Sequence, residues 1–261
     1  NLGGAGGKSA AQLAAEARAL RADRHMQKQR NVAATRIQAA FRAYGDAART
    51  RGAYLADLDG VQWPCVSQED WVRRTRLLVF SYTPAFSSRH ARHVVQWAAH
   101  LPEDAWSIGG EAWHTLLALV VRQMLHMLEH HPKSLGELAG AYIDAMAKLV
   151  PAQESYAEAQ ARLVRSMLRH GLHRALAAYM ESLPVQRTQD AGLCMELMLR
   201  PFAVFSTSSD AFVEDVADSE APGRAVALRG FVASVLTLPH LSARLPLGHV
   251  QTLAASLPLD E

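Results

Sequence analysis

The chain has 261 residues, of which 49% are hydrophobic and 20% are charged, and its formal net charge is +2. This composition excludes wholesale disorder, a collagen-like repeat and a small disulfide-stabilised fold. The longest strongly apolar run, Thr115–Val121, is far shorter than the roughly 20 residues needed to cross a bilayer, so we expect no membrane span. Cys65 and Cys194 are far apart and form no CxxC motif, which suits the reducing cytoplasm or nucleus.

The small net charge conceals two regions of opposite sign. Residues 1–51 contain ten Lys or Arg and three acidic residues, a balance of +7, which leaves 17 basic and 22 acidic residues, a balance of −5, in residues 52–261. A clustered positive field attracts acidic proteins, nucleic acid or anionic lipid. The asymmetry therefore indicates the kind of partner rather than the fold.

The basic region is predicted to be a helical arm. Residues 1–8 read as a flexible glycine-rich lead, and residues 9–58 as the arm itself. Ser9 followed by Gln12 is typical of a capping box, and the residues up to Tyr44 have high helix propensity. No proline precedes Pro64, so we expect one long helix, and a break near Gly45 or Gly52 is the alternative.

The body, residues 67–261, is predicted to be all-α and to continue beyond Glu261. Helix starts and stops recur along it, for example at Ser67, at Ser134 with Glu137, and at the C-terminal glycine Gly171. Residues 111–129 are apolar around nearly the whole helix circumference, so that helix should be central. Helices of this length suit a helical-hairpin stack, an armadillo- or HEAT-like superhelix, or an irregular bundle. No fixed repeat period decides between them.

The arm contains the clearest functional pattern. Ala33–Tyr44 reads AATRIQAAFRAY, in which Ile37, Phe41 and Tyr44 follow one another at i, i+4 and i+7. That spacing is how an amphipathic helix fills a partner's hydrophobic groove. Gln38 can donate and accept hydrogen bonds beside the stripe, and Arg42 adds positive charge for an acidic surface. This is an IQ motif, the recognition helix for calmodulin or a related light chain, and the five residues are the predicted partner-binding site.

Other basic residues of the arm would support the same contact: Arg24, Lys28, Arg30, Arg36, Arg49 and Arg51. The motif is a half-motif, because Ala43 stands where glycine is usual and Ala47 where a second basic residue is usual. An equally weighted alternative is that the same apolar stripe packs the arm onto the chain's own body.

Residues 1–50 resemble the N-terminus of a known family. The order is LGGAGGKSAAQ, a basic helix, and then RNVAATRIQAAFRAYGDAART. It resembles the IQ-motif-containing HECT-type E3 ubiquitin-protein ligases of the proteasome-associated branch. The matching residues are Leu2, Gly3, Gly4, Ile37, Gln38, Arg42 and Tyr44. Two stretches of the body, RHGLHRALAAYMESLP and RGFVASVLTLPHLSARLP, look similar to the family more loosely.

The resemblance implies a role in protein ubiquitination. Members of that family are transferases that move ubiquitin from an E2 enzyme to a cysteine of a C-terminal HECT domain and then to substrate lysine. That domain is not in these 261 residues, and neither Cys65, in QWPCVSQ, nor Cys194, in AGLCMELM, has the Thr-Cys-x-Asn context. The resemblance therefore implies a non-catalytic region that recruits partners or substrates, with an E2 and the proteasome as further partners of the whole ligase.

Other kinds of site are disfavoured by spacing. The pairs His90/His93, His126/His130 and His170/His173 each supply two ligands to one helix face, which is too few for a metal, and no HExxH occurs. LGGAGGKS lacks the first glycine of a phosphate-binding loop. We expect no metal, no cofactor and no catalytic residue. The body tryptophans are expected to pack in its core, although a peptide groove is an alternative.

A function from another class stays open. The chain could be a free-standing helical scaffold or a nucleic-acid adaptor unrelated to ubiquitin, since an Arg-rich helix can neutralise phosphates. Nucleic acid is disfavoured because no aromatic residue interleaves with the basic ones before Phe41.

Overall fold

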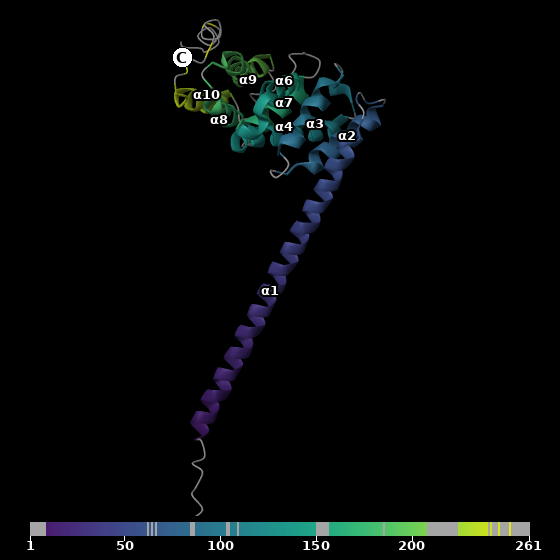
Figure 1. Cartoon of the computed structure of the whole chain (residues 1–261). Coiled ribbons are helices and arrows are strands. Elements are labelled where there is room, and N and C mark those ends of the chain that lie inside the picture. The colour runs from purple at the N-terminus through teal and green to yellow at the C-terminus, as the bar shows by residue number, and fades with distance from the viewer. Residues whose placement is uncertain are drawn as a thin grey trace, which may run out of the picture. The chain divides into compact units, whose positions relative to one another are not determined.

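The computed structural model describes residues 9–61, 67–83, 87–102, 105–108, 110–149, 157–184, 186–207 and 224–239, and the single residues 63, 65, 241, 245 and 251. Every regular element in these ranges is a helix, which confirms the all-α class (Figure 1). The chain divides into two compact units, residues 1–50 and 51–261. Leu2, Gly3 and Gly4 of the predicted lead lie outside the described residues.

The first unit is formed by most of one long helix, α1 (Ala10–Asp59). Its N-terminus carries the predicted capping box, because Ser9 N donates to Gln12 Oε1 at 2.9 Å and Gln12 N donates to Ser9 Oγ at 3.3 Å. The helix continues through Gly45 and Gly52, which confirms the predicted single long helix and excludes the alternative break. A glycine costs a helix only about 1 kcal/mol, and the good helix formers around these two positions offset that cost.

The second unit contains the last turns of α1 and the helices that follow. The long ones are α2 (Gln68–Ser81), α3 (Ser87–Ala99), α4 (Gly110–His130), α6 (Ala139–Lys148), α7 (Ala157–Arg169), α8 (Leu172–Ser182), α9 (Thr188–Thr207) and α10 (Arg224–Leu236). Short elements connect some of them: η2 (Ala105–Ser107), α5 (Pro132–Leu135) and η3 (Gly136–Leu138). Among the described residues, no helix is both long and apolar enough to span a bilayer.

Helix ends in this unit follow local signals. Ser67 Oγ accepts the backbone N–H of Asp70 at 3.2 Å, as the sequence predicts. Gly171 follows α7 with φ of 78°, the left-handed conformation that glycine adopts most easily. The predicted helix start at Ser134 is wrong, because α5 already begins at Pro132, a favourable first helical residue.

The core is arranged around α4. That helix contacts α2, α7 and α8, and neighbouring helices such as α2 and α3 also contact each other. Its buried residues are Trp113, Leu116, Leu117, Val120, Val121, Met124, Leu125, Met127 and Leu128, which confirms its predicted central position. At the end of α1, Leu55 and Leu58 are buried in the same core.

Four of the five body tryptophans lie in this core. Trp71, Trp97, Trp106 and Trp113 are buried, and Trp63 packs against them from a half-buried position. Trp97 Nε1 donates to Thr75 Oγ1 at 2.9 Å, and Trp113 Nε1 donates to the carbonyl oxygen of Ala105 at 2.7 Å. Because their polar atoms are satisfied inside the unit, the two rings act as structural anchors rather than as the walls of a peptide groove.

Candidate partner-binding helix

The predicted site residues all lie on the first-unit part of α1 and are all exposed. The side chains of Ile37, Phe41 and Tyr44 are 59%, 75% and 72% exposed, and Gln38 and Arg42 are exposed as well. The helix brings the three apolar residues to one side, because four and seven residues are close to one and two turns. They form what we call the IQ stripe: Ile37, Phe41 and Tyr44.

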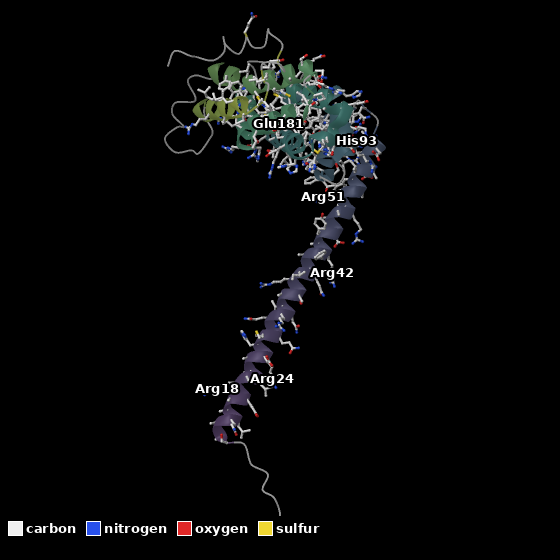
Figure 2. The ribbon with its side chains drawn as sticks, turned by 60° about the vertical axis from the view of Figure 1, so that its left-hand side comes forward. Arg18, Arg24, Arg42, Arg51, His93 and Glu181 are labelled. Carbon is white, nitrogen blue, oxygen red and sulfur yellow. The ribbon has the colours of Figure 1, made fainter. Side chains whose placement is uncertain are left out.

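Most basic residues of the arm lie on the side of α1 away from the IQ stripe. Lys28 is nine residues from Ile37, which is about two and a half turns and therefore the opposite side of the helix. At 100° of rotation per residue, Arg21, Arg24 and Arg42 all lie within about 40° of Lys28 around the helix axis. Figure 2 shows Arg18, Arg24 and Arg42 along this helix. We call Arg21, Arg24, Lys28 and Arg42 the basic face.

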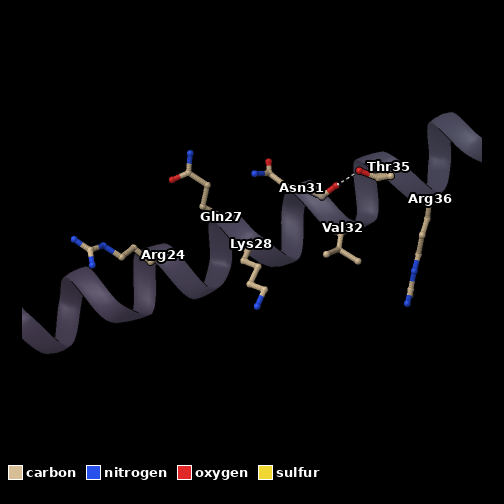
Figure 3. A pocket seen from close by; sticks show the side chains of 7 residues that line it. All are labelled: Arg24, Gln27, Lys28, Asn31, Val32, Thr35 and Arg36. Carbon is tan, nitrogen blue, oxygen red and sulfur yellow. Dashed lines mark hydrogen bonds between the residues drawn. The ribbon is translucent and has the colours of Figure 1, made fainter.

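Part of this face lines an open hollow on the helix surface. The lining residues are Arg24, Gln27, Lys28, Asn31, Val32, Thr35 and Arg36. Figure 3 shows the side chains of Lys28, Val32 and Arg36 along one edge, and those of Gln27, Asn31 and Thr35 along the other. Thr35 Oγ1 donates to the carbonyl oxygen of Asn31 at 2.9 Å, which occupies its donor within the helix. The hollow thus offers three cations and two amide side chains to a partner.

The charges of the basic face are not neutralised within the described part of the chain. Arg21, Arg24, Lys28 and Arg42 form no ion pair with any described residue. Arg49 differs, because its guanidinium pairs with the carboxylate of Asp46 one turn earlier. The position of the basic face opposite the IQ stripe could have been found from the sequence with a helical wheel, although Arg30, seven residues before Ile37, lies on the side of the stripe.

Neither cysteine has the environment of a catalytic thiol. Cys194 is fully buried in α9, and this burial raises the pKa of its thiol well above the usual range, with the charge of Asp190 acting in the same direction. Burial also raises the pKa of Cys65, although the nearby Arg74 acts in the opposite direction. A thiol with a raised pKa is mostly protonated at neutral pH and is therefore a poor nucleophile.

Several of the described histidines form structural contacts. His93 Nε2 lies 2.8 Å from Asp59 Oδ1, and Arg89 also donates to the Asp59 carboxylate, so this group connects the end of α1 to α3. The Tyr82 hydroxyl is hydrogen-bonded to His126 Nδ1 at 2.6 Å, and burial raises the pKa of Tyr82 to about 12. Among the described residues, no group of His, Cys, Asp and Glu side chains is placed to hold a metal ion.

Stability of the body is expected to fall between pH 6.5 and pH 4 because of His90. Its Nε2–H donates to the carbonyl oxygen of Leu78 at 2.9 Å, its Nδ1 is buried without a partner, and burial lowers its pKa to about 4. Below pH 6.5 the His90 side chain becomes protonated in the unfolded chain but stays neutral in the folded chain. Protonation therefore favours the unfolded state, and stability is lost as pH falls towards 4. A shift of this size corresponds to about 3 kcal/mol over the window.

Urea titrations at several pH values would measure this loss. His90→Gln should flatten the dependence in that window, whereas the exposed His100→Gln should leave it unchanged. An identical pH profile for His90→Gln and the original chain would contradict the assignment.

Comparison of the chain with protein-family models, with curated proteins and with solved structures finds no match. The functional assignment therefore depends on the residues themselves. What they provide is a long helix with an exposed apolar stripe on one side and an unneutralised basic face on the other.

Proposed function

We propose that α1 is a ligand helix for an acidic, calmodulin-like protein. The observation that carries the proposal is the exposure of Ile37, Phe41 and Tyr44, which are 59%, 75% and 72% exposed on one side of the helix next to Gln38. Three large apolar side chains in a row are the anchors that a hydrophobic groove requires. Gln38 adds an amide that can bond to backbone groups of the partner.

Apolar burial accounts for only part of the expected affinity. Burying one large side chain contributes about 1.5–3 kcal/mol, so the IQ stripe would give roughly 5–9 kcal/mol before the cost of ordering is subtracted. A micromolar complex requires about 8 kcal/mol. The stripe alone therefore supports a weak complex, and a tighter one needs the charges of the arm.

The positions of those charges favour a partner that surrounds the helix. A groove that covers only the IQ stripe would leave the basic face in solvent. A protein with two acidic lobes can contact the stripe with one lobe and the basic face with the other, and the charge complementarity would also speed association. This geometry is the reason for proposing a calmodulin-like protein rather than a single-groove domain.

Titration of calmodulin with the full chain, by calorimetry with and without calcium, tests the proposal. We expect a one-to-one complex with micromolar or tighter affinity in at least one of the two conditions. Absence of a complex in both conditions would overturn it. If the IQ stripe instead packs onto the body, substitutions in the stripe would lower the stability of the chain.

We also propose that the chain is the non-catalytic recruiting region of a HECT-type E3 ubiquitin ligase. The support is the resemblance of residues 1–50 to that family and the raised pKa of the Cys194 thiol, which suits a structural cysteine. Given E1, a set of E2 enzymes and ubiquitin, the chain should form no reducible ubiquitin adduct, while an isolated HECT domain run in parallel should form one. An adduct on Cys65 or Cys194 would contradict this assignment.

A further inference from the structure

The body carries a concave surface between the last turns of α1 and the outer side of α2. This surface does not involve residues 1–50. Its lining residues are Tyr54, Gln68, Glu69, Val72, Arg73, Arg76, Leu77 and Phe80. We call this surface the α2 groove. All eight residues belong to the second unit, so the groove is formed within one compact part of the chain.

The sequence of α2 produces two different sides. Trp71, Thr75 and Leu78 are buried and hold the helix in the core. Phe80 is nine residues after Trp71 and therefore lies on the opposite, outer side of the helix, whereas Val72 lies at its flank and is half-buried. Phe80 is 58% exposed although α2 is firmly anchored. The exposed ring is therefore not a consequence of a loosely packed helix.

The groove has an apolar floor that is open to solvent. Val72 and Leu77 are half-buried against the core, Tyr54 is half-buried on α1, and Phe80 stands at one end. A single exposed apolar residue is normal on a protein surface. An exposed aromatic residue at the end of an apolar concavity is instead typical of the anchor position of an interface.

Two arginines give the groove its charge. Arg73 and Arg76 are exposed, and neither forms an ion pair with a described residue. The nearby carboxylate of Asp70 is already paired, because it lies 3.7 Å from Arg74 Nη2. Glu69 is the one acidic residue among those lining the groove, and it lies at the end opposite to Phe80. The centre of the groove is therefore positive.

We propose that the α2 groove binds an acidic amphipathic helix of a partner protein. From Glu69 to Phe80 the groove is about 16 Å long, which is the length of three helical turns. Apolar side chains one turn apart on the partner would cover Val72, Leu77 and Phe80. Carboxylates one turn apart would reach Arg73 and Arg76, because these two guanidinium groups are also separated by about one turn.

This proposal goes beyond the ligand-helix role of α1 and does not depend on it. In the first case the chain offers a helix to the groove of a partner, whereas here it offers a groove to the helix of a partner. A chain with both could hold two proteins at once, which is the arrangement that recruitment requires.

A labelled synthetic peptide tests the proposal with the full chain. The probe is an acetylated and amidated 16-residue helix with Leu at i, i+4, i+7 and i+11 and with Glu and Ala elsewhere, and binding is followed by fluorescence anisotropy. We expect saturable binding, and at least tenfold weaker binding of the same peptide with Lys in place of Glu. Absence of saturable binding of the acidic probe would overturn the proposal.

Substitutions locate the binding surface. Arg73→Glu with Arg76→Glu should weaken binding of the acidic peptide at least tenfold and should improve binding of the Lys peptide, and Phe80→Ser should weaken both. The control variants Arg229→Glu and Leu236→Ser alter exposed residues of α10 and should change neither affinity.

A second control separates this site from the arm, which is also basic. Arg24→Glu with Lys28→Glu should leave binding of the acidic peptide unchanged if the α2 groove is its site. Loss of binding with that variant, and not with the α2 variants, would place the peptide on the arm and would overturn the proposal while leaving the role of α1 intact.

Discussion

The double substitution Ile37→Asp with Gln38→Ala is expected to weaken binding of a calmodulin-like protein by at least 100-fold. Ile37 is 59% exposed, so the change leaves the fold intact while it places a carboxylate where the partner expects an apolar side chain. The loss combines about 1.5–3 kcal/mol of burial with the cost of removing a charge from water, and about 3 kcal/mol corresponds to 100-fold. Calorimetry against calmodulin measures the effect directly.

A matched control uses the same helix outside the motif. Leu20 is 58% exposed, and the double substitution Leu20→Asp with Gln29→Ala makes closely similar chemical changes away from the IQ stripe and from the hollow. This variant should bind within a few-fold of the original chain. Equal affinity of the two double variants would show that the partner does not contact the IQ stripe. The assignment of Ile37, Gln38, Phe41, Arg42 and Tyr44 as the partner-binding site would then be wrong.

Replacing Trp97 with alanine is expected to lower the free energy of unfolding of the body by about 3–5 kcal/mol. Trp97 is completely buried, and its indole N–H donates to the buried Thr75 hydroxyl at 2.9 Å. The substitution removes a large apolar volume and leaves the Thr75 hydroxyl without that donor. This loss is a large fraction of the stability of an ordinary domain, so the variant should be close to unfolding at 37 °C.

Urea unfolding followed by the fluorescence of the remaining tryptophans checks this expectation. Those residues all lie in the body, so the signal does not include the helical arm. The exposed Leu236→Ala should change stability by no more than about 0.5 kcal/mol. A loss of less than about 1 kcal/mol for Trp97→Ala would contradict the packing described for this core.

Several features that depend on residues close in sequence were predicted correctly, although the helix start at Ser134 was not. The capping box of Ser9 and Gln12 and the cap at Ser67 involve residues three positions apart, and the left-handed turn at Gly171 involves one residue. The central position of α4 followed from apolar residues around its whole circumference. The alternative break at Gly45 or Gly52 does not occur, because a weak local preference does not outweigh fifty residues of continuous helix.

The sequence by itself determined the all-α class, the caps at Ser9 and Ser67 and the alignment of the IQ stripe along one side of its helix, since these depend on spacings of three to seven residues. Only the tertiary structure decided which distant residues meet. Asp59 is hydrogen-bonded to His93, and His90 is hydrogen-bonded to the carbonyl oxygen of Leu78. Tyr54 of α1 lines the α2 groove together with residues of α2 such as Phe80. No periodic pattern encodes such meetings, because they depend on how whole helices pack and on which side chains the packing leaves in water.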